Sequence, residues 1–422
     1  MRKSARRSGR EQSSQGQLRL PLRELVREAL FDTVIVSGLG FVGEVLEEER
    51  AVLCGPRYER DPQRAALRAG QVRSSLSLGG RRVAVERPRV RSVAGHELSL
   101  PSWRAWSGRD PLEQRAMEQM LVGVSTRRYA RSLEPLPGEL KVHGIGKSVV
   151  SDRFVVGTAG RLAALMQRRL GGLQLIAVMI DGVHFAEHVV LAAIGIDVGG
   201  AKHVLGLREG ATENAAACKA LLADLIERGL PTERGLLFVI DGAKALHKAI
   251  SDIFGERALI QRCREHKKRN VTDALPERLR SSVRSAMSQA YATRDAKRAA
   301  RLLENLARRL EAGHPGAAAS LREGLQDTLT LTRLDLPEAL ERVLSSTNLI
   351  ENLFSRVRDL AHRVKRWQGG TMILRWTAAG VLEAERSFRR IAGYRALPKL
   401  IAALRAHDAA IDRRLENARR AA

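Results

Sequence analysis

The chain has 422 residues, 44% hydrophobic and 28% charged, enough for roughly two to four domains with buried cores. Its 72 Lys and Arg residues outnumber 47 Asp and Glu residues, giving a net charge of +25 that favours a polyanionic partner over other binding classes. Three cysteines argue against a disulfide framework. We find no apolar run of about 20 residues and no secretion or lipidation signal, so we expect a cytoplasmic, nucleoid-associated protein and disfavour membrane binding.

The sequence pattern of the N-terminal part predicts a basic arm, a helix and a hairpin. Residues 1–17 are expected to form a disordered basic arm, and 18–50 a helix. Four apolar residues of that helix are expected to lie near one another: Leu25, Leu30, Val34 and Val36. Residues 72–100 alternate in hydrophobicity around a Gly-Gly pair, which predicts a β-hairpin with one basic face. Residues 18–110 are therefore interpreted as a helical plus β-hairpin region.

Residues 111–171 are interpreted as a helix-turn-helix-like DNA-binding domain. Ser125 would cap a short helix whose inward-facing residues are Tyr129, Ala130 and Leu133. A second helix would follow Gly144 and carry candidate DNA contacts at Lys147, Ser148 and Arg153. Two ordinary surface helices are the alternative.

From residue 172 the pattern changes to alternating strands and helices. Strands are predicted at 173–181, 187–197, 202–208, 235–241 and 257–262, with helices at 214–228, capped by Thr212 or Asn214, and at 244–254. This order is typical of a ribonuclease-H-like core, although several other α/β folds share it. Residues 172–266 are predicted to be the first part of that core, 267–345 an α-helical insertion, 346–392 the second part of the core, and 393–422 a basic helical tail.

Three acidic residues stand in distinctive settings. Asp181 and Asp241 each close a long apolar run and precede glycine, and Glu351 stands near the start of a predicted helix. An Asp-Gly pair is also a common turn, but two such pairs at predicted strand ends are harder to explain in that way. Three carboxylates are sufficient to hold a pair of Mg²⁺ ions for phosphoryl transfer.

The sequence Cys263-Arg-Glu-His266 admits several interpretations. It resembles half of a zinc site, but the other two cysteines are not placed to complete one. A Cys–His contact that orients a neighbour in the acidic site is preferred, and a buried cysteine beside a surface histidine is the alternative.

Basic residues near these motifs are candidate phosphate contacts. They are Lys267, Lys268, Arg269, Arg356, Arg358, Arg363, Lys365 and Arg366. Several of those that follow Glu351 are expected to share its helix face or lie near it, and a solvated helix face is the alternative. Trp367 and Trp376 are expected to pack against hydrophobic neighbours, with base stacking as the alternative.

Eight short motifs occur together, in one order. They are LCGPRYER (53–60), GVSTRRYAR (123–131), GIGKSVVS (144–151), IDG (180–182), VLGLREG (204–210), IDG (240–242), QRCREHKKRNV (261–271) and STNLIEN (346–352). In these motifs the chain resembles the Mutator-like bacterial insertion-sequence transposases, over about residues 50 to 390.

The resemblance implies an α/β ribonuclease-H-like catalytic core interrupted by an all-α insertion, preceded by helical and small β-hairpin DNA-binding regions. It implies that Asp181, Asp241 and Glu351 are the catalytic DDE residues and ligands of two Mg²⁺ ions, replaceable by Mn²⁺, with Cys263 and His266 as the family's Cys-x-x-His signature. It further implies binding of terminal inverted repeats and target DNA as a homodimer or larger assembly, and copy-out chemistry through a circular intermediate. A domesticated DNA-binding protein without catalysis and a structure-specific nuclease are the alternatives.

Overall fold

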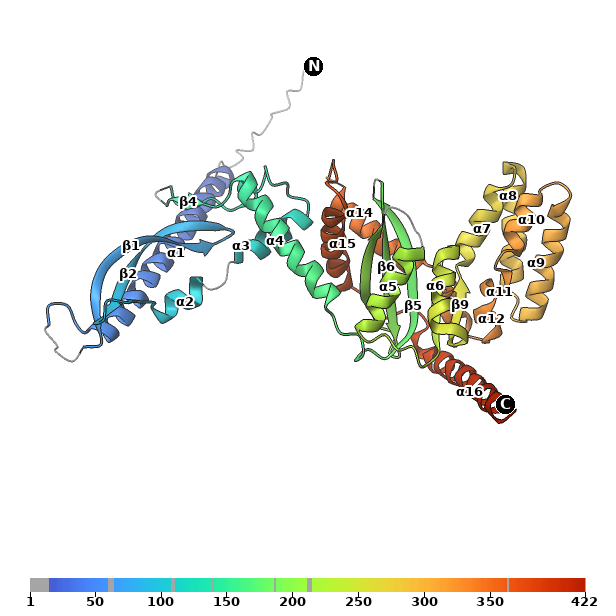
Figure 1. Ribbon diagram of the computed structural model, residues 1–422. Helices are drawn as coiled ribbons and strands as arrows, with labels where there is room; N and C mark the ends of the chain where they lie inside the picture. Colours follow the sequence, from blue (N-terminus) through green and yellow to red (C-terminus); the bar gives the residue numbers. More distant parts are fainter. Residues whose placement is uncertain are drawn as a thin grey trace, which may run out of the picture. The chain divides into compact units, whose positions relative to one another are not determined.

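The computed structural model describes residues 15–421 apart from 60–63, 108–110, 139, 186, 211–214 and 363. The chain divides into two compact units, Met1–Phe154 and Val155–Ala422, which are described separately below (Figure 1). Most of the predicted basic arm lies outside the described residues, as do the proposed helix caps Thr212 and Asn214 and the candidate DNA contact Arg363.

The first unit is built on a long helix and a hairpin. Helix α1 (Gln15–Cys54) packs against strands β1 (Ala66–Leu78) and β2 (Arg81–Ser92) (Figure 1). Leu78 pairs with Arg81 across a two-residue turn, and both of its glycines have positive φ, as the predicted hairpin requires. Two short strands, β3 (Glu97–Leu98) and β4 (Val142–His143), pair with β2.

Helix α1 corrects two expectations. Leu30, Val34 and Val36, which the sequence predicts to lie near one another, are exposed by 63%, 59% and 53%, so they do not form a buried face of the helix. Helix α1 is also long and apolar enough over Ala29–Cys54, by length and composition, to cross a membrane, since an 18-residue window within it has a mean hydropathy of 1.7. The expectation of no apolar run of that length is therefore wrong, although one such helix near the N-terminus is weak evidence for a span.

Among the described residues, the first helix of the predicted helix-turn-helix, which Ser125 would cap, does not form. After α2 (Pro101–Ser107) and α3 (Pro111–Leu121), the chain makes turns and a single 3₁₀ turn, η1 (Ala130–Ser132). Tyr129 is fully buried and donates a hydrogen bond to the Gly80 carbonyl at 2.8 Å, whereas Ala130 is exposed. Tyr129 therefore anchors its segment to the hairpin turn, and the segment does not form an independent helix. Helix α4 (Lys147–Met166) forms where the second helix is predicted.

The second unit contains a five-stranded sheet in the order β7-β6-β5-β8-β9. The strands are β5 (Leu175–Phe185), β6 (His188–Asp197), β7 (Lys202–Gly210), β8 (Leu236–Ile240) and β9 (Ala258–Arg262). β5, β6 and β7 are antiparallel neighbours, and β8 and β9 run parallel to β5. Helices α5 (Ala215–Glu227) and α6 (Lys244–Phe254) connect β7, β8 and β9.

Helices cover both faces of this sheet (Figure 1). Helices α5 and α6 share one core with alternate strand residues such as Val178 and Phe238. The other face packs, through residues such as Met179 and Val239, on helices α13 (Glu338–Leu344), α14 (Asn348–Ala361), α15 (Gly370–Glu385) and α16 (Leu397–Ala421). Side chains alternate between faces with period two, so a residue's position in the strand decides which helices it meets.

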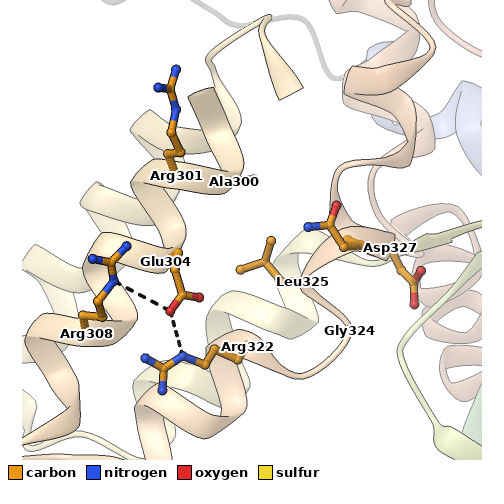
Figure 2. Close-up of a pocket in the computed structure, with 9 residues that line it drawn as sticks. Ala300, Arg301, Glu304, Arg308, Arg322, Gly324, Leu325 and Asp327 are labelled. Atoms are coloured by element: carbon orange, nitrogen blue, oxygen red, sulfur yellow. Dashed lines mark hydrogen bonds and ion pairs between the residues drawn. The ribbon is translucent and has the colours of Figure 1, made fainter. Parts of the chain in front are cut away.

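Between β9 and α13 the described residues contain helices and turns only. They are α7 (Arg264–Asp273), α8 (Glu277–Tyr291), α9 (Ala296–Glu311), α10 (Pro315–Arg322), α11 (Leu325–Thr328) and α12 (Thr330–Arg333). They have their own core, from Val271 to Leu329, whereas Leu331 packs with the sheet. Figure 2 shows a hollow between α9 and the α10–α11 segment, where Glu304 bridges Arg308 and Arg322.

Candidate metal centre

Two aspartates lie at matching positions of neighbouring parallel strands. Ile180 of β5 pairs with Ile240 of β8, so the residues that follow them, Asp181 and Asp241, are adjacent. Both are in phase with Met179 and Val239, which pack beneath α14 and α15. The two carboxylates are therefore placed on the face of the sheet that these helices cover.

The sequence predicts that Asp181 ends its strand, and this prediction is wrong. Strand β5 continues to Phe185 because residues 181–185 pair with residues 188–192 of β6 in one hairpin. Asp181 is consequently held inside the ladder and is only 7% exposed. Asp241 does follow its strand directly, and its Oδ1 accepts a hydrogen bond from the Ala243 amide at 2.9 Å.

A buried arginine packs against the glycine that follows Asp241. Gly242 has φ +110°, and a Cβ at this position would lie 2.6 Å from Cζ of Arg262. Arg262 cannot easily move aside, since it is 7% exposed and donates to the Glu323 carbonyl at 2.9 Å. Only glycine fits here, because both the backbone angle and the close guanidinium exclude a side chain.

The third parallel strand brings the Cys-x-x-His segment to the same edge. Arg262 of β9 pairs with Ile240, and the amide of Cys263 donates to the Ile240 carbonyl at 2.7 Å. Cys263 is then the N-cap of α7, with its Sγ accepting from the His266 amide at 3.5 Å. This cap fixes His266 in the first turn of α7.

Glu351 reaches the site from the first turn of α14. His266 Nε2 lies 3.3 Å from Glu351 Oε1, and His266 Nδ1 lies 3.3 Å from Oγ1 of Thr347, the N-cap residue of α14. Ligand atoms of Asp181, His266 and Glu351 all lie within 4.8 Å of one another. Among the described residues this compact group does not include Asp241, whose negative charge nevertheless acts on Asp181.

Burial and closely spaced charges shift the pKa values of three groups of the site: Asp181, His266 and Cys263. Burial, and then the charge of Asp241, raise the pKa of Asp181 to about 7. A hydrogen bond with Cys263, and then the charges of Cys263, Asp181 and Glu351, raise the pKa of His266 to about 9 against the effect of burial. Burial acts to raise the pKa of Cys263, but its hydrogen bonds with His266 outweigh this and lower it.

These residues fit a hard divalent cation. Carboxylate oxygens are preferred by Mg²⁺ and Mn²⁺, and Asp181 is a buried carboxylate beside a second carboxylate, which a cation would stabilise in its charged form. The zinc interpretation of Cys263 and His266 gains no support, because Cys263 is fully buried as a helix cap and the other two free cysteines, Cys54 and Cys218, belong to other cores.

The basic residues predicted to contact DNA are in different environments. The prediction that Lys267 contacts DNA at the surface is wrong, because Lys267 is fully buried and its ammonium donates to the Ser320 carbonyl at 2.6 Å. Lys268 pairs with Glu265 at 2.5 Å, and Arg153 donates to the Gly144 carbonyl at 2.7 Å. The exposed ones are Lys147, Ser148, Arg269, Arg356, Arg358, Lys365 and Arg366.

Only part of the predicted basic face lies beside Glu351. At 100° per residue Arg358 is about 20° around α14 from Glu351, whereas Arg356 is about 140° away. Arg356 instead donates to Ser387 Oγ at 2.6 Å. Trp367 and Trp376 pack edge to face, with ring centroids 6.5 Å apart, and Trp376 is 8% exposed, so the packing interpretation of the tryptophans is confirmed.

Three further residues of the site have no role in the sequence-based prediction: Thr347, Gly242 and Arg262. Thr347 stands in the same short motif as Glu351, where a threonine before Asn-Leu-Ile-Glu is a recognisable cap signal. Gly242 follows Asp241, and its need for positive φ is typical of glycine after a strand. Arg262 has no such signal, since its contact with Gly242 depends on the pairing of β8 with β9.

Comparison with known proteins gives one consistent family. The model of the Mutator family of transposases matches residues 24–390. The transposase for insertion sequence element IST2 of Acidithiobacillus ferrooxidans is 30% identical over 176 residues, 42% of this chain and 58% of that protein. The transposases for ISRM5 of Rhizobium meliloti and IS1081 of Mycobacterium tuberculosis are 27% and 26% identical, covering 82% and 86% of this chain and 86% and 88% of those proteins.

Proposed function

The chain belongs to the Mutator family of transposases, and on that premise we propose that it cleaves and joins DNA at the ends of its insertion sequence by a DDE mechanism. The observation that carries this proposal is the convergence of Asp181, His266 and Glu351 within 4.8 Å, beside Asp241 on the neighbouring strand. Residues from two strands, α7 and α14 form one acidic site.

In the proposed mechanism Asp181, Asp241 and Glu351 hold Mg²⁺. The bound metal would lower the pKa of the attacking water or DNA hydroxyl and stabilise the leaving oxygen. Asp181 is fixed by the β5–β6 hairpin, and Asp241 by the Ala243 amide. His266 holds Glu351 through Nε2 and is itself fixed by Cys263. The protein contributes positioning and charge, and no covalent protein–DNA intermediate is needed.

We further propose that the five-stranded sheet is a ribonuclease-H-like core and the α7–α12 segment its insertion. The sheet order β7-β6-β5-β8-β9, with three antiparallel strands followed by two parallel ones, supports this assignment. The separate core of the helical segment supports its description as an insertion. The first unit would recognise the terminal inverted repeats, which accords with its basic hairpin, and DNA binding would place the protein on the nucleoid.

A strand-transfer assay tests the proposal. Purified protein is incubated with labelled duplexes that carry its own element ends, in Mg²⁺, Mn²⁺ or Ca²⁺. We expect nicked and joined products in Mg²⁺ and Mn²⁺. Nicks without joined products would instead favour a structure-specific nuclease, and binding without either product would favour a domesticated DNA-binding protein.

A further inference from the structure

A cavity of about 450 Å³ lies on the side of α14 away from Glu351. It is lined by Lys202 at the start of β7, by Arg356 of α14, and by Ser387, Phe388 and Arg389 just after α15. Arg356 is about 140° around α14 from Glu351, so this cavity is separate from the metal centre. None of the described residues that line it is acidic.

The absence of acidic side chains from the lining distinguishes this cavity from others in the same unit. In the hollow of Figure 2, Glu304 lies 3.0 Å from Arg322 and 4.0 Å from Arg308, so carboxylates neutralise the arginines there. The cavity beside Gly242 is similarly lined by Glu323 and Asp327. Lys202, Arg356 and Arg389 therefore form a cationic cluster whose lining provides no counter-charge.

Two of the three cations of the cluster, Lys202 and Arg356, are held in place. The ammonium of Lys202 stacks on the Phe388 ring, 4.8 Å from its centroid, and Arg356 is fixed by its hydrogen bond to Ser387. Burial lowers the pKa of Lys202, and repulsion from the like charge of Arg356 lowers it further. An anion bound among them would relieve that repulsion.

The sheet register gives the separation of this cluster from the metal centre. Asp181 pairs with Ala192 of β6, and Lys202 pairs with Ile196 of β6. The four residue steps from Ala192 to Ile196 span roughly 14 Å along the strands, at about 3.4 Å per residue. The two strand spacings from β5 to β7 add about 9.6 Å across the strands, so the separation is roughly 17 Å. A DNA strand that leaves the metal centre would reach the cluster within about five base pairs, at 3.4 Å per base pair.

We propose that Lys202, Arg356 and Arg389 form a seat for a backbone phosphate of the DNA bound at the metal centre. Arginine guanidinium groups match phosphate oxygens bidentately, and lysine adds a point charge. The Phe388 ring and the buried Leu353 offer an apolar surface to the deoxyribose. This inference rests on the proposed function, since it takes the DNA of that reaction as the ligand.

Neutral methylphosphonate linkages test the seat one phosphate at a time. Binding of element-end duplexes is measured in EDTA, so that cleavage is not required, with one methylphosphonate at each position around the cleavage site. We expect one position within about five base pairs of that site to weaken wild-type binding about ten-fold. The same linkage should weaken binding by Lys202→Gln/Arg389→Gln less than two-fold, because the contact is already lost.

Salt dependence and a matched variant complete the design. The double variant should lower the slope of log K against log salt by about 0.9, the contribution of one phosphate contact. Lys399→Gln/Arg405→Gln, which removes two exposed charges of α16 outside the cavity, should retain the wild-type response to methylphosphonate. Arg389→Gln alone should partly reduce the effect of the methylphosphonate on binding. Because Arg389 is exposed, this single variant keeps the test valid if the double variant does not fold.

The possible results separate the two proposals. If a methylphosphonate weakens DNA binding equally in wild type and in the double variant at every position, the phosphate seat is overturned while the proposed function stays intact. Competition by 10 mM inorganic phosphate that abolishes the ten-fold effect would assign the cavity to free phosphate and also overturn it. Wild-type protein that does not bind the duplexes at all would overturn both proposals.

Discussion

His266 Nε2 lies 3.3 Å from Glu351 Oε1, although an entire helical segment with its own core separates them in the chain. The contact joins the first turn of α7, directly after the last strand, to the first turn of α14. It places the glutamate beside Asp181 of the sheet, within the group whose ligand atoms lie within 4.8 Å of one another. The helical segment therefore leaves and re-enters the core at the metal centre itself.

Replacing His266 should loosen Glu351 without removing a proposed metal ligand. His266→Ala is expected to raise the Mg²⁺ concentration for half-maximal cleavage about ten-fold or more, since second partners of metal ligands typically contribute 10- to 100-fold in affinity or activity. Mg²⁺ titration of the cleavage rate measures this. His407→Ala, which removes a partly exposed histidine of α16 bonded to the Glu256 carbonyl, is the control, and equal effects of the two variants would contradict the assigned role.

Asp181→Asn should stabilise the metal-free protein while abolishing cleavage. The pKa of Asp181 is raised to about 7 from its usual 3.8, so the metal-free fold loses stability as pH rises from about 4 to about 7, by up to about 4 kcal/mol. The asparagine removes this loss. Denaturant unfolding in EDTA at pH 5 and pH 7.5 should show a gain for the variant that is larger at pH 7.5. DNA binding should be nearly unchanged, and a variant less stable than wild type at both pH values would refute the prediction.

Metal binding should depend on pH in the same range. Because Mg²⁺ needs the charged form of Asp181, and metal competes with protons for a ligand, the apparent Mg²⁺ affinity should rise between pH 6 and pH 8. The increase in Tm on adding 10 mM MgCl₂ should be larger at pH 8 than at pH 6, and Asp181→Asn should lose most of this increase. A pH-independent Mg²⁺ effect on the wild-type protein would be inconsistent with Asp181 as a ligand.

Gly242→Ala should displace Asp241. The new Cβ would lie 2.6 Å from Cζ of Arg262 at a backbone φ of +110°, so strain and overlap together should cost about 2 kcal/mol or more. Cleavage should fall by more than the loss of folded protein explains. Gly255→Ala is the matched control, since its φ is also positive but its Cβ would meet nothing within 4 Å. It should lower stability and keep the Mg²⁺ requirement unchanged.

The secondary structure around the site is largely predictable from local pattern. Two strands and one helix form within a few residues of their predicted bounds, which are 173–181, 235–241 and 244–254. Their signals are local, since long apolar runs end at glycines. The end of β5 is not predicted. Residues 182–185 are extended by their pairing with β6, and that depends on a partner rather than on the run itself.

Tertiary contacts explain the other errors. Lys267 is basic and follows a motif, yet it is buried, with its ammonium donating a hydrogen bond to the Ser320 carbonyl of α10. Leu30 and Val34 have the spacing of a packed helix face but are exposed, since α1 meets the hairpin through its later residues, such as Leu46. Neither the burial of Lys267 nor the exposure of Leu30 and Val34 can be predicted from neighbouring residues in the sequence, because both depend on which segments pack together in the fold.

Cleavage of element-end DNA by wild type and by Glu351→Gln is the most direct test of the DDE proposal. The amide keeps the size of the side chain but removes the negative charge that would bind Mg²⁺, and Glu338→Gln, at an exposed position on α13, is the matched control. We expect nicked and joined products from wild type and Glu338→Gln, and binding without products from Glu351→Gln. Wild-type levels of product from Glu351→Gln would contradict the account.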